Sequence, residues 1–105
     1  MKNIVIRGSE VVDWTSFHDV FSKALAFPDF YGKNMNAWID CLTDLSLPCS
    51  GMTNLELSDD ESLLIQFTDS CAFKKRCPEI FDALIECSQF VNQRSQRPLL
   101  AIAFC

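Results

Sequence analysis

The stretch SLLIQF, residues 62–67, is an almost unbroken apolar run in the middle of the chain. Such a run, without alternation between apolar and polar side chains, is typical of a β-strand that is covered on both faces, as in a parallel sheet. A second buried strand of this kind is predicted for LLAIAF, residues 99–104. The short β-branched run at residues 3–6, which Arg7 and Gly8 follow, predicts a third strand near the start of the chain.

Helical patterns fill the interval between the first two predicted strands. The first helix opens at Asp13 or Thr15 and ends at Pro28 or just before it. Its apolar stripe recurs at steps of three and four residues and consists of Trp14, Phe17, Phe21, Ala24 and Leu25. The single histidine, His18, stands beside this stripe, so we expect it at the boundary of the core or at the surface.

A second helix in the same interval begins after Asn34, a suitable N-cap, and runs to about Leu45. On a helical wheel, one arc of this helix holds Met35, Trp38, Cys41, Leu42 and Leu45. The opposite arc holds Asn36, Asp40 and Thr43. The helix therefore has an apolar face and a polar face, and a polar face of this kind is by default solvated surface.

The second interval holds a short helical turn at residues 69–76 and a longer helix that starts with Pro78. The apolar stripe predicted for the longer helix is Phe81, Leu84, Ile85, Ser88 and Val91. Strands separated by helices predict an α/β fold, a three-stranded parallel sheet with right-handed connections, in a single domain over residues 1–105. The alternation at residues 55–57 leaves open one extra short antiparallel strand.

Charge and hydropathy exclude some partners. The chain of 105 residues carries 14 acidic and 9 basic side chains, a net charge of −5. Its mean field repels phosphate backbones, which disfavours direct nucleic-acid binding and favours a basic partner. The first apolar run is too short for a signal peptide or a membrane span, so we expect a cytoplasmic protein that binds no membrane.

The residue types that catalysis or cofactor binding would need lack the required spacing. The six cysteines include no C-x-x-C pair and the chain has one histidine, so we predict reduced thiols and no metal site. No Gly-rich phosphate loop is present, so no nucleotide cofactor is expected. No base is spaced to activate a cysteine, and we therefore assign no catalytic residue and expect no enzyme.

Residues 27–42, FPDFYGKNMNAWIDCL, carry a more specific pattern. An aromatic pair is followed by Gly, any residue, Asn, an apolar residue, Asn and Ala, and then by Asp-Cys-Leu after two further positions. This stretch closely resembles the central motif of the barstar family of intracellular ribonuclease inhibitors. The order of strands and helices agrees along the rest of the chain. The resemblance implies a small parallel sheet with packed helices and a protein that is not an enzyme.

In that family the loop and the second helix plug a nuclease active site, and helix carboxylates take the positions of substrate phosphates. The resemblance implies Asp40 as the central carboxylate and Phe30 as the aromatic loop contact, with Tyr31 and Gly32 beside it. The flanking contacts that it implies are Asn34, Asn36, Ile39 and Thr43. The implied partner is a basic nuclease toxin, in the first place a ribonuclease, whose cationic groups would accept an acidic helix face in a 1:1 complex.

Two positions depart from barstar itself. Asn36 stands where barstar has a carboxylate, and Ile39 stands where it has Trp. Both differences favour a target other than barnase. Asp44, one turn beyond Asp40, either restores part of the lost charge or is plain surface. Barstar also contributes an acidic residue from its last helix, and the candidates for that position are Glu79, Asp82 and Glu86.

Two functions remain open at this point. One is an inhibitor that protects the producing cell by blocking a nuclease toxin. The other is an interaction or regulatory module with the barstar fold and a non-nuclease partner, in which Asn36 marks the loss of phosphate mimicry. The connection at residues 47–60, longer than in barstar, could set partner choice or could merely cap the edge of the sheet.

Overall fold

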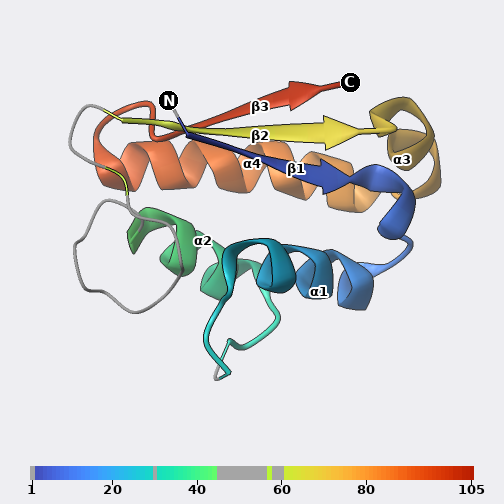
Figure 1. Cartoon of the computed structure of the whole chain (residues 1–105), viewed down its shortest axis with the longest axis horizontal. Coiled ribbons are helices and arrows are strands. Elements are labelled where there is room, and N and C mark those ends of the chain that lie inside the picture. The colour runs from blue at the N-terminus through green and yellow to red at the C-terminus, as the bar shows by residue number, and fades with distance from the viewer. Residues whose placement is uncertain (1, 30, 45–56, 58–60) are drawn as a thin grey trace.

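The computed structural model describes residues 2–29, 31–44, 57 and 61–105. Its elements are β1 (Lys2–Arg7), the short 3-10 helix η1 (Gly8–Glu10), α1 (Trp14–Leu25), α2 (Met35–Thr43), β2 (Leu63–Thr68), α3 (Ser70–Arg76), α4 (Pro78–Ser95) and β3 (Leu100–Phe104) (Figure 1). The strands pair in parallel in the order β1-β2-β3. The predicted α/β fold with a three-stranded parallel sheet is confirmed. The extra strand considered at residues 55–57 lies mostly outside the described residues.

The register of the sheet determines which residues of the three strands lie side by side. Ile65 of β2 is paired with Ile4 of β1 and Ile102 of β3. One row further on, Phe67 is paired with Ile6 and Phe104. Ile65 and Phe67 are fully buried because β2 lies between the other two strands.

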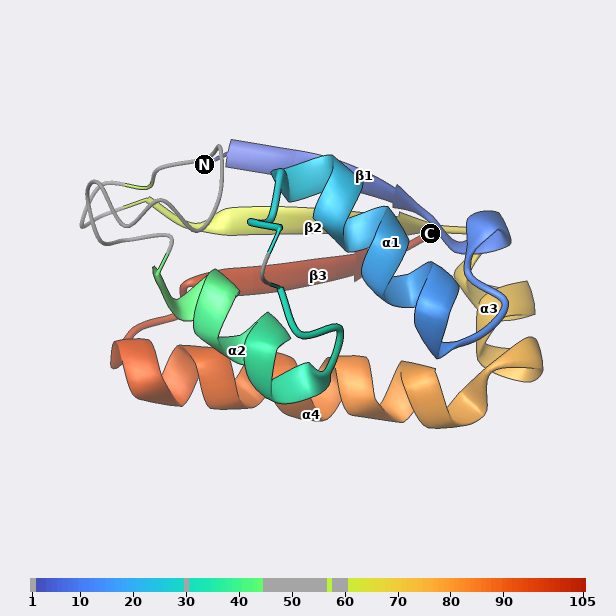
Figure 2. The same cartoon turned by 90° about the horizontal axis from the view of Figure 1, so that it is seen from below.

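The prediction that the strands are covered on both faces is wrong for the part of the chain that the structure describes. Helices α1, α2 and α4 all lie on one side of the sheet (Figures 1 and 2). Residues of β2 accordingly alternate between buried and half-buried along the strand. On the edge strands, Val5 is 53% exposed and Ala101 is exposed. The second face of β2 carries Leu64, Gln66 and Thr68, which are half-buried.

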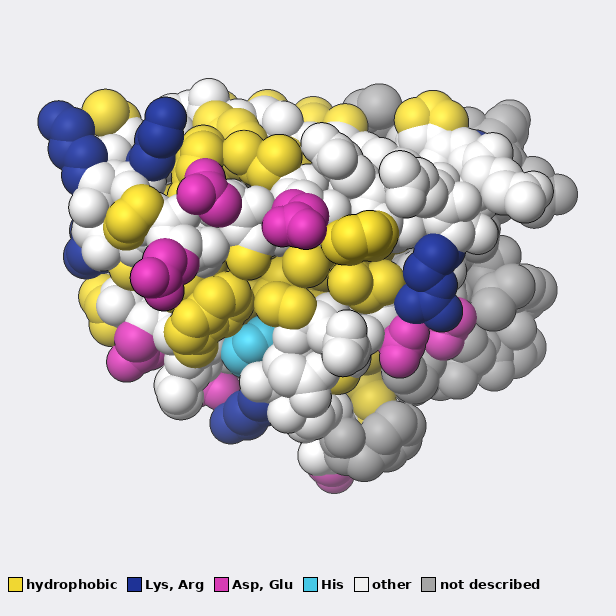
Figure 3. Space-filling view, turned by 180° about the vertical axis from the view of Figure 1, so that it is seen from behind, with side chains coloured by type: hydrophobic (Ala, Val, Ile, Leu, Met, Phe, Trp, Pro, Cys, Tyr) yellow, Lys and Arg dark blue, Asp and Glu magenta, His cyan; other side chains and the backbone are white. Residues whose placement is uncertain are grey.

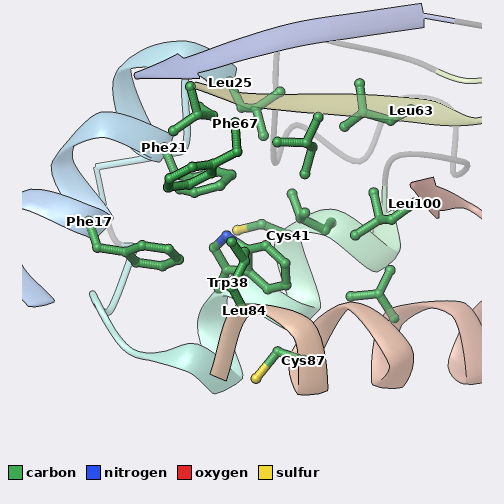
Figure 4. Close-up of a cluster of buried hydrophobic side chains, with 14 of the residues drawn as sticks. Phe17, Phe21, Leu25, Trp38, Cys41, Leu63, Phe67, Leu84, Cys87 and Leu100 are labelled. Atoms are coloured by element: carbon green, nitrogen blue, oxygen red, sulfur yellow. The ribbon is translucent and has the colours of Figure 1, made fainter. Parts of the chain in front are cut away.

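The core lies between the sheet and these helices (Figure 4). The Trp38 ring of α2 packs edge-on against Phe21 of α1, with ring centroids 5.7 Å apart. The stripe predicted for α4 is partly wrong, because Ile85 is 36% exposed. The residues of α4 that are buried are Ile80, Leu84, Cys87, Ser88 and Val91. The buried arc is turned from the predicted one because α4 packs against α2 as well as against β3.

Capping residues fix where α1 begins and ends. Asp13, not Thr15, is the N-cap: its carboxylate accepts a hydrogen bond from the Ser16 backbone N–H at 2.8 Å. Hydrogen bonding to Ser16 also lowers the pKa of Asp13. The helix ends at Ala26 in the left-handed region, two residues before Pro28. Because α1 ends there, residues 27–29 and 31–34 lie between α1 and α2.

Candidate functional site

Helix α2 carries the polar face that the sequence predicts as a binding site. It begins after Asn34, whose side-chain oxygen accepts a hydrogen bond from the Ala37 backbone N–H at 2.8 Å. The Asn34 amide also donates to the carbonyl of Gly32 at 3.3 Å. Asn34 is therefore confirmed as the N-cap, and it joins the loop to the helix.

The inner face of α2 fixes the helix to the core. Trp38 and Leu42 are fully buried and Cys41 is 1% exposed. Trp38 and Cys41 belong to the cluster of buried side chains (Figure 4). Burial, followed by the charges of Asp44 and Asp40, raises the pKa of the Cys41 thiol to about 11. The thiol is therefore protonated at neutral pH, and it packs as a small hydrophobic side chain.

The outer face of α2 brings together the residues predicted from its polar arc. Asn36 and Asp40 are exposed, and Ile39 and Thr43 are half-buried. The Thr43 hydroxyl donates to the Ile39 carbonyl at 2.6 Å, so its proton is used within the helix. Asp44 follows as the C-cap and is half-buried. This face offers a partner one amide, one apolar side chain and one carboxylate in its middle.

The carboxylate in the middle of this face is paired within the chain. Arg94 of α4 donates from Nη1 to Oδ1 of Asp40 at 2.7 Å. Both side chains are about half exposed, 53% for Arg94 and 55% for Asp40. An exposed pair of this kind contributes about 0–1 kcal/mol to stability, so it can be broken or reorganised at little cost.

Helices α2 and α4 lie side by side (Figure 2). A shallow hollow lies between their outer faces. The hollow measures about 450 Å³. It is lined by Asn36, Ile39, Asp40, Phe90 and Arg94. Phe90 is 45% exposed, which is unusual for a ring of its size and supplies apolar surface next to the ion pair. The sequence gives no sign that Phe90 and Arg94 belong to this site, because their approach to α2 depends on how two helices pack.

The loop before α2 is braced from α1. The Nδ1 atom of His18 lies 2.6 Å from the hydroxyl oxygen of Tyr31, and the Tyr31 ring also packs on Phe27. His18 is 2% exposed, so the expectation of a boundary or surface position is wrong. The helix turns His18 toward the loop, where Tyr31 covers it and supplies a hydrogen-bond partner. Burial raises the pKa of Tyr31 and lowers that of His18.

A second brace holds the same loop. Lys33 forms an ion pair with Asp19 of α1 at 3.1 Å. The backbone N–H of Tyr31 donates to the Pro28 carbonyl at 2.9 Å, which closes a turn. Gly32 is exposed between these braces. Phe30, the predicted aromatic contact of this loop, lies outside the described residues.

Acidic residues of α4 lie away from the hollow. Glu79, Asp82 and Glu86 are exposed, and none of them lines the space between α2 and α4. Glu79 instead lines a separate hollow with Trp14 of α1 and Arg76 of α3. Among the α4 side chains that the structure describes, those that face α2 at the hollow are an aromatic ring and a cation.

Two further properties concern the described part of the chain. A metal ion would need a group of at least three His, Cys, Asp or Glu side chains. Within residues 2–29, 31–44, 57 and 61–105, no such group is present. No helix in those segments has both the length and the apolar character needed to cross a membrane. The described site consists of polar and apolar side chains on two helices and a loop.

The fold and the site define a small α/β protein in which a helix, anchored by its inner face and braced through its preceding loop, presents a polar outer face. A family model described as Barstar (barnase inhibitor) matches residues 1–104, and the chain belongs to this family. The chain is also similar to a Bacillus subtilis (strain 168) protein named "Putative ribonuclease inhibitor YrdF". The two are 38% identical over 61 residues, which cover 56% of this chain and 67% of that protein.

Proposed function

We propose that this protein inhibits a basic ribonuclease by placing the outer face of α2 over the active site of the enzyme. The observation that carries this proposal is the position of Asp40, exposed in the middle of that face. Family membership and the name of the Bacillus subtilis relative support the ribonuclease as the class of partner.

The chemistry of the two surfaces is complementary. A ribonuclease must bind a phosphodiester, so its active site carries Arg, Lys or His donors. Arg94 occupies Oδ1 of Asp40, and Oδ2 has no partner among the described residues. A carboxylate has about four lone-pair positions, so Asp40 can accept hydrogen bonds from a partner cation while it keeps Arg94. Net charge adds to this, since the chain carries −5 and would attract a basic enzyme.

The braces of the loop suit a rigid inhibitor. The hydrogen bond between the buried His18 and Tyr31 holds this part of the loop against α1 before a partner arrives, and the exposed ion pair between Asp19 and Lys33 adds little to it. Pre-organised loops lose less conformational entropy on binding. We propose that Tyr31 and Gly32, with Phe30, contact the rim of the active site, while Asn34 mainly supports the loop. Asn36, Ile39, Thr43 and Asp44 would complete the contact on α2.

A single experiment tests this function. Parent and Asp40→Asn proteins are mixed with barnase and with basic ribonucleases encoded beside the gene, and both capture and RNA cleavage are measured. We expect the parent to capture at least one of these enzymes and to suppress cleavage, and we expect Asp40→Asn to lose both effects. Glu10→Gln, which removes one charge at an exposed position of η1, is the matched control.

One observation favours a second candidate. The ion pair with Arg94 and the amide at Asn36 leave the middle of the face close to neutral. A barstar-fold module for a non-nuclease partner would have no need for strong phosphate mimicry. Capture of a partner without ribonuclease activity, lost in Asp40→Asn and kept in Glu10→Gln, would establish this second function instead.

A further inference from the structure

The α4 side of the hollow has chemistry that phosphate mimicry does not explain. Phosphate mimicry needs carboxylates, but α4 brings the Phe90 ring and the Arg94 guanidinium to the edge of α2. Figure 3 shows hydrophobic side chains gathered along the middle of the face seen from behind, with acidic side chains beside them. Phe90 is 45% exposed, and its ring is not part of the buried core.

Arg94 lies beside Asp40 in the free protein, so a partner that approaches Asp40 also meets the guanidinium. The two groups are 2.7 Å apart, and Ile39 and Phe90 line the same hollow. A guanidinium has five N–H donors in a planar fork, and the described contacts of Arg94 use one nitrogen, on Oδ1 of Asp40. The remaining donors require an acceptor once the face is covered, because buried donors without partners weaken a complex.

A uniformly cationic active site would repel Arg94. A site that places a carboxylate beside its cations would satisfy both members of the pair, with a partner cation on Asp40 and a partner carboxylate on Arg94. Ribonucleases that use general acid–base chemistry supply such a group when the base is a Glu or Asp. The ion pair therefore favours those basic enzymes whose active sites place cations and a carboxylate at matching positions. The net charge of the enzyme alone does not decide this preference.

We propose that Phe90 and Arg94 belong to the binding surface, and that the partner is a ribonuclease whose active site sets a carboxylate opposite Arg94 and an apolar side chain between Ile39 and Phe90. This proposal rests on the proposed function and specifies the partner within it. Phe and Arg are both enriched in protein interfaces relative to the rest of the surface, and Arg is among the residues that most often dominate the binding energy.

The test compares variants of α4 with matched controls on the ribonuclease captured by the parent, with barnase assayed alongside it. Arg94→Gln removes the cation, and Phe90→Ala removes the ring. The controls are Arg7→Gln, which removes an exposed cation from β1, and Ile85→Ala, which removes an exposed apolar side chain from α4 outside the hollow. Thermal unfolding of each variant checks that the fold is kept.

We expect Arg94→Gln and Phe90→Ala each to raise the dissociation constant by about tenfold or more, while the two controls leave it unchanged. Replacing the catalytic carboxylate of the ribonuclease with its amide should weaken the parent complex and should abolish the effect of Arg94→Gln. This coupling is specific to a direct charge pair, and a structural role of Arg94 would not produce it.

The outcomes separate the two proposals. If the parent captures a ribonuclease and Asp40→Asn weakens it, but Arg94→Gln and Phe90→Ala do not, the role of α4 is wrong and the inhibitor function stands. Tighter binding by Arg94→Gln also overturns the inference, since it would mean that Arg94 only competes for Asp40. If the parent captures no ribonuclease, both proposals are wrong.

Discussion

The Nδ1 atom of His18 and the hydroxyl oxygen of Tyr31 lie 2.6 Å apart and join helix α1 to the loop that precedes α2. This hydrogen bond connects the core to the proposed binding face, because Tyr31 directly precedes Gly32 and lies three residues before the N-cap Asn34. The partners are 13 positions apart in the sequence and neither lies in the helix that carries Asp40. The geometry of the face therefore depends on a residue that does not belong to it.

Tyr31→Phe should loosen this connection. The change removes the hydroxyl and leaves the buried His18 Nδ1 without its partner, which costs about 1–2 kcal/mol in the free energy of unfolding. Urea denaturation of parent and variant measures this loss. The packing of the ring on Phe27 is kept in Tyr31→Phe, so the loss of stability reports on the hydrogen bond. Unchanged stability in Tyr31→Phe would show that the bond is not needed.

The stability of the fold should also depend on pH through His18. Burial lowers the pKa of His18 in the folded chain from its ordinary value of 6.5, while Asp19 opposes this shift and Lys33 adds to it. The unfolded chain then binds more protons than the folded chain between the two pKa values. The stabilising contribution is therefore complete above pH 6.5 and is lost as the pH falls toward the lower pKa of the folded state.

The measurement is the free energy of unfolding at neutral pH and at about one to two units below the ordinary pKa of histidine. Carboxylates contribute a slope of their own at low pH, so the quantity to compare is the difference between the parent and His18→Gln. We expect the parent to lose more stability than His18→Gln over this interval. Parallel pH profiles for the two proteins would contradict the assignment.

Asp40→Ala should weaken the complex with the cognate ribonuclease. Removing one partner of a charge pair that becomes buried on binding costs about 2–5 kcal/mol, at least tens-fold in the dissociation constant. This scale comes from measured charge pairs, those of the barnase–barstar complex included. The stability of the free protein should change by less than about 1 kcal/mol, since the pair with Arg94 is half exposed. Binding by calorimetry and thermal unfolding separate the two effects, and unchanged affinity would exclude Asp40 from the contact.

Local periodicity was sufficient to predict much of this fold and part of the site. The three- and four-residue spacing around Trp38 predicts both faces of α2. Asn34, as an N-cap, predicts where the helix begins. Unbroken apolar runs predict β2 and β3 because runs of this length are typical of strands and short for helices. These features depend on residues close together in the sequence, and the structure confirms them.

The missed features all depend on residues far apart in the sequence. Arg94 and Asp40 are 54 positions apart, and nothing in either segment indicates the other. The burial of His18 depends on a loop that folds back over α1, and the turned apolar face of α4 depends on the position of α2. Periodicity shows which side chains share a face, but it does not show which neighbour covers that face.

Asn36→Asp restores the carboxylate that barstar has at this position. It should raise both the stability of the fold and the affinity for barnase. Residue 36 lies in the first turn of α2, where a negative charge favours the helix by about 0.3–1 kcal/mol, so the free energy of unfolding should rise. The same carboxylate would sit beside Asp40 on the exposed face and should tighten the complex with barnase, by about tenfold if a cation lies opposite. Asn3→Asp, an equal change of charge at an exposed position of β1, should leave the affinity nearly unchanged. A more stable variant with weaker binding would mean that the partner places an acceptor or an anion against residue 36, and that the amide is the group its surface requires.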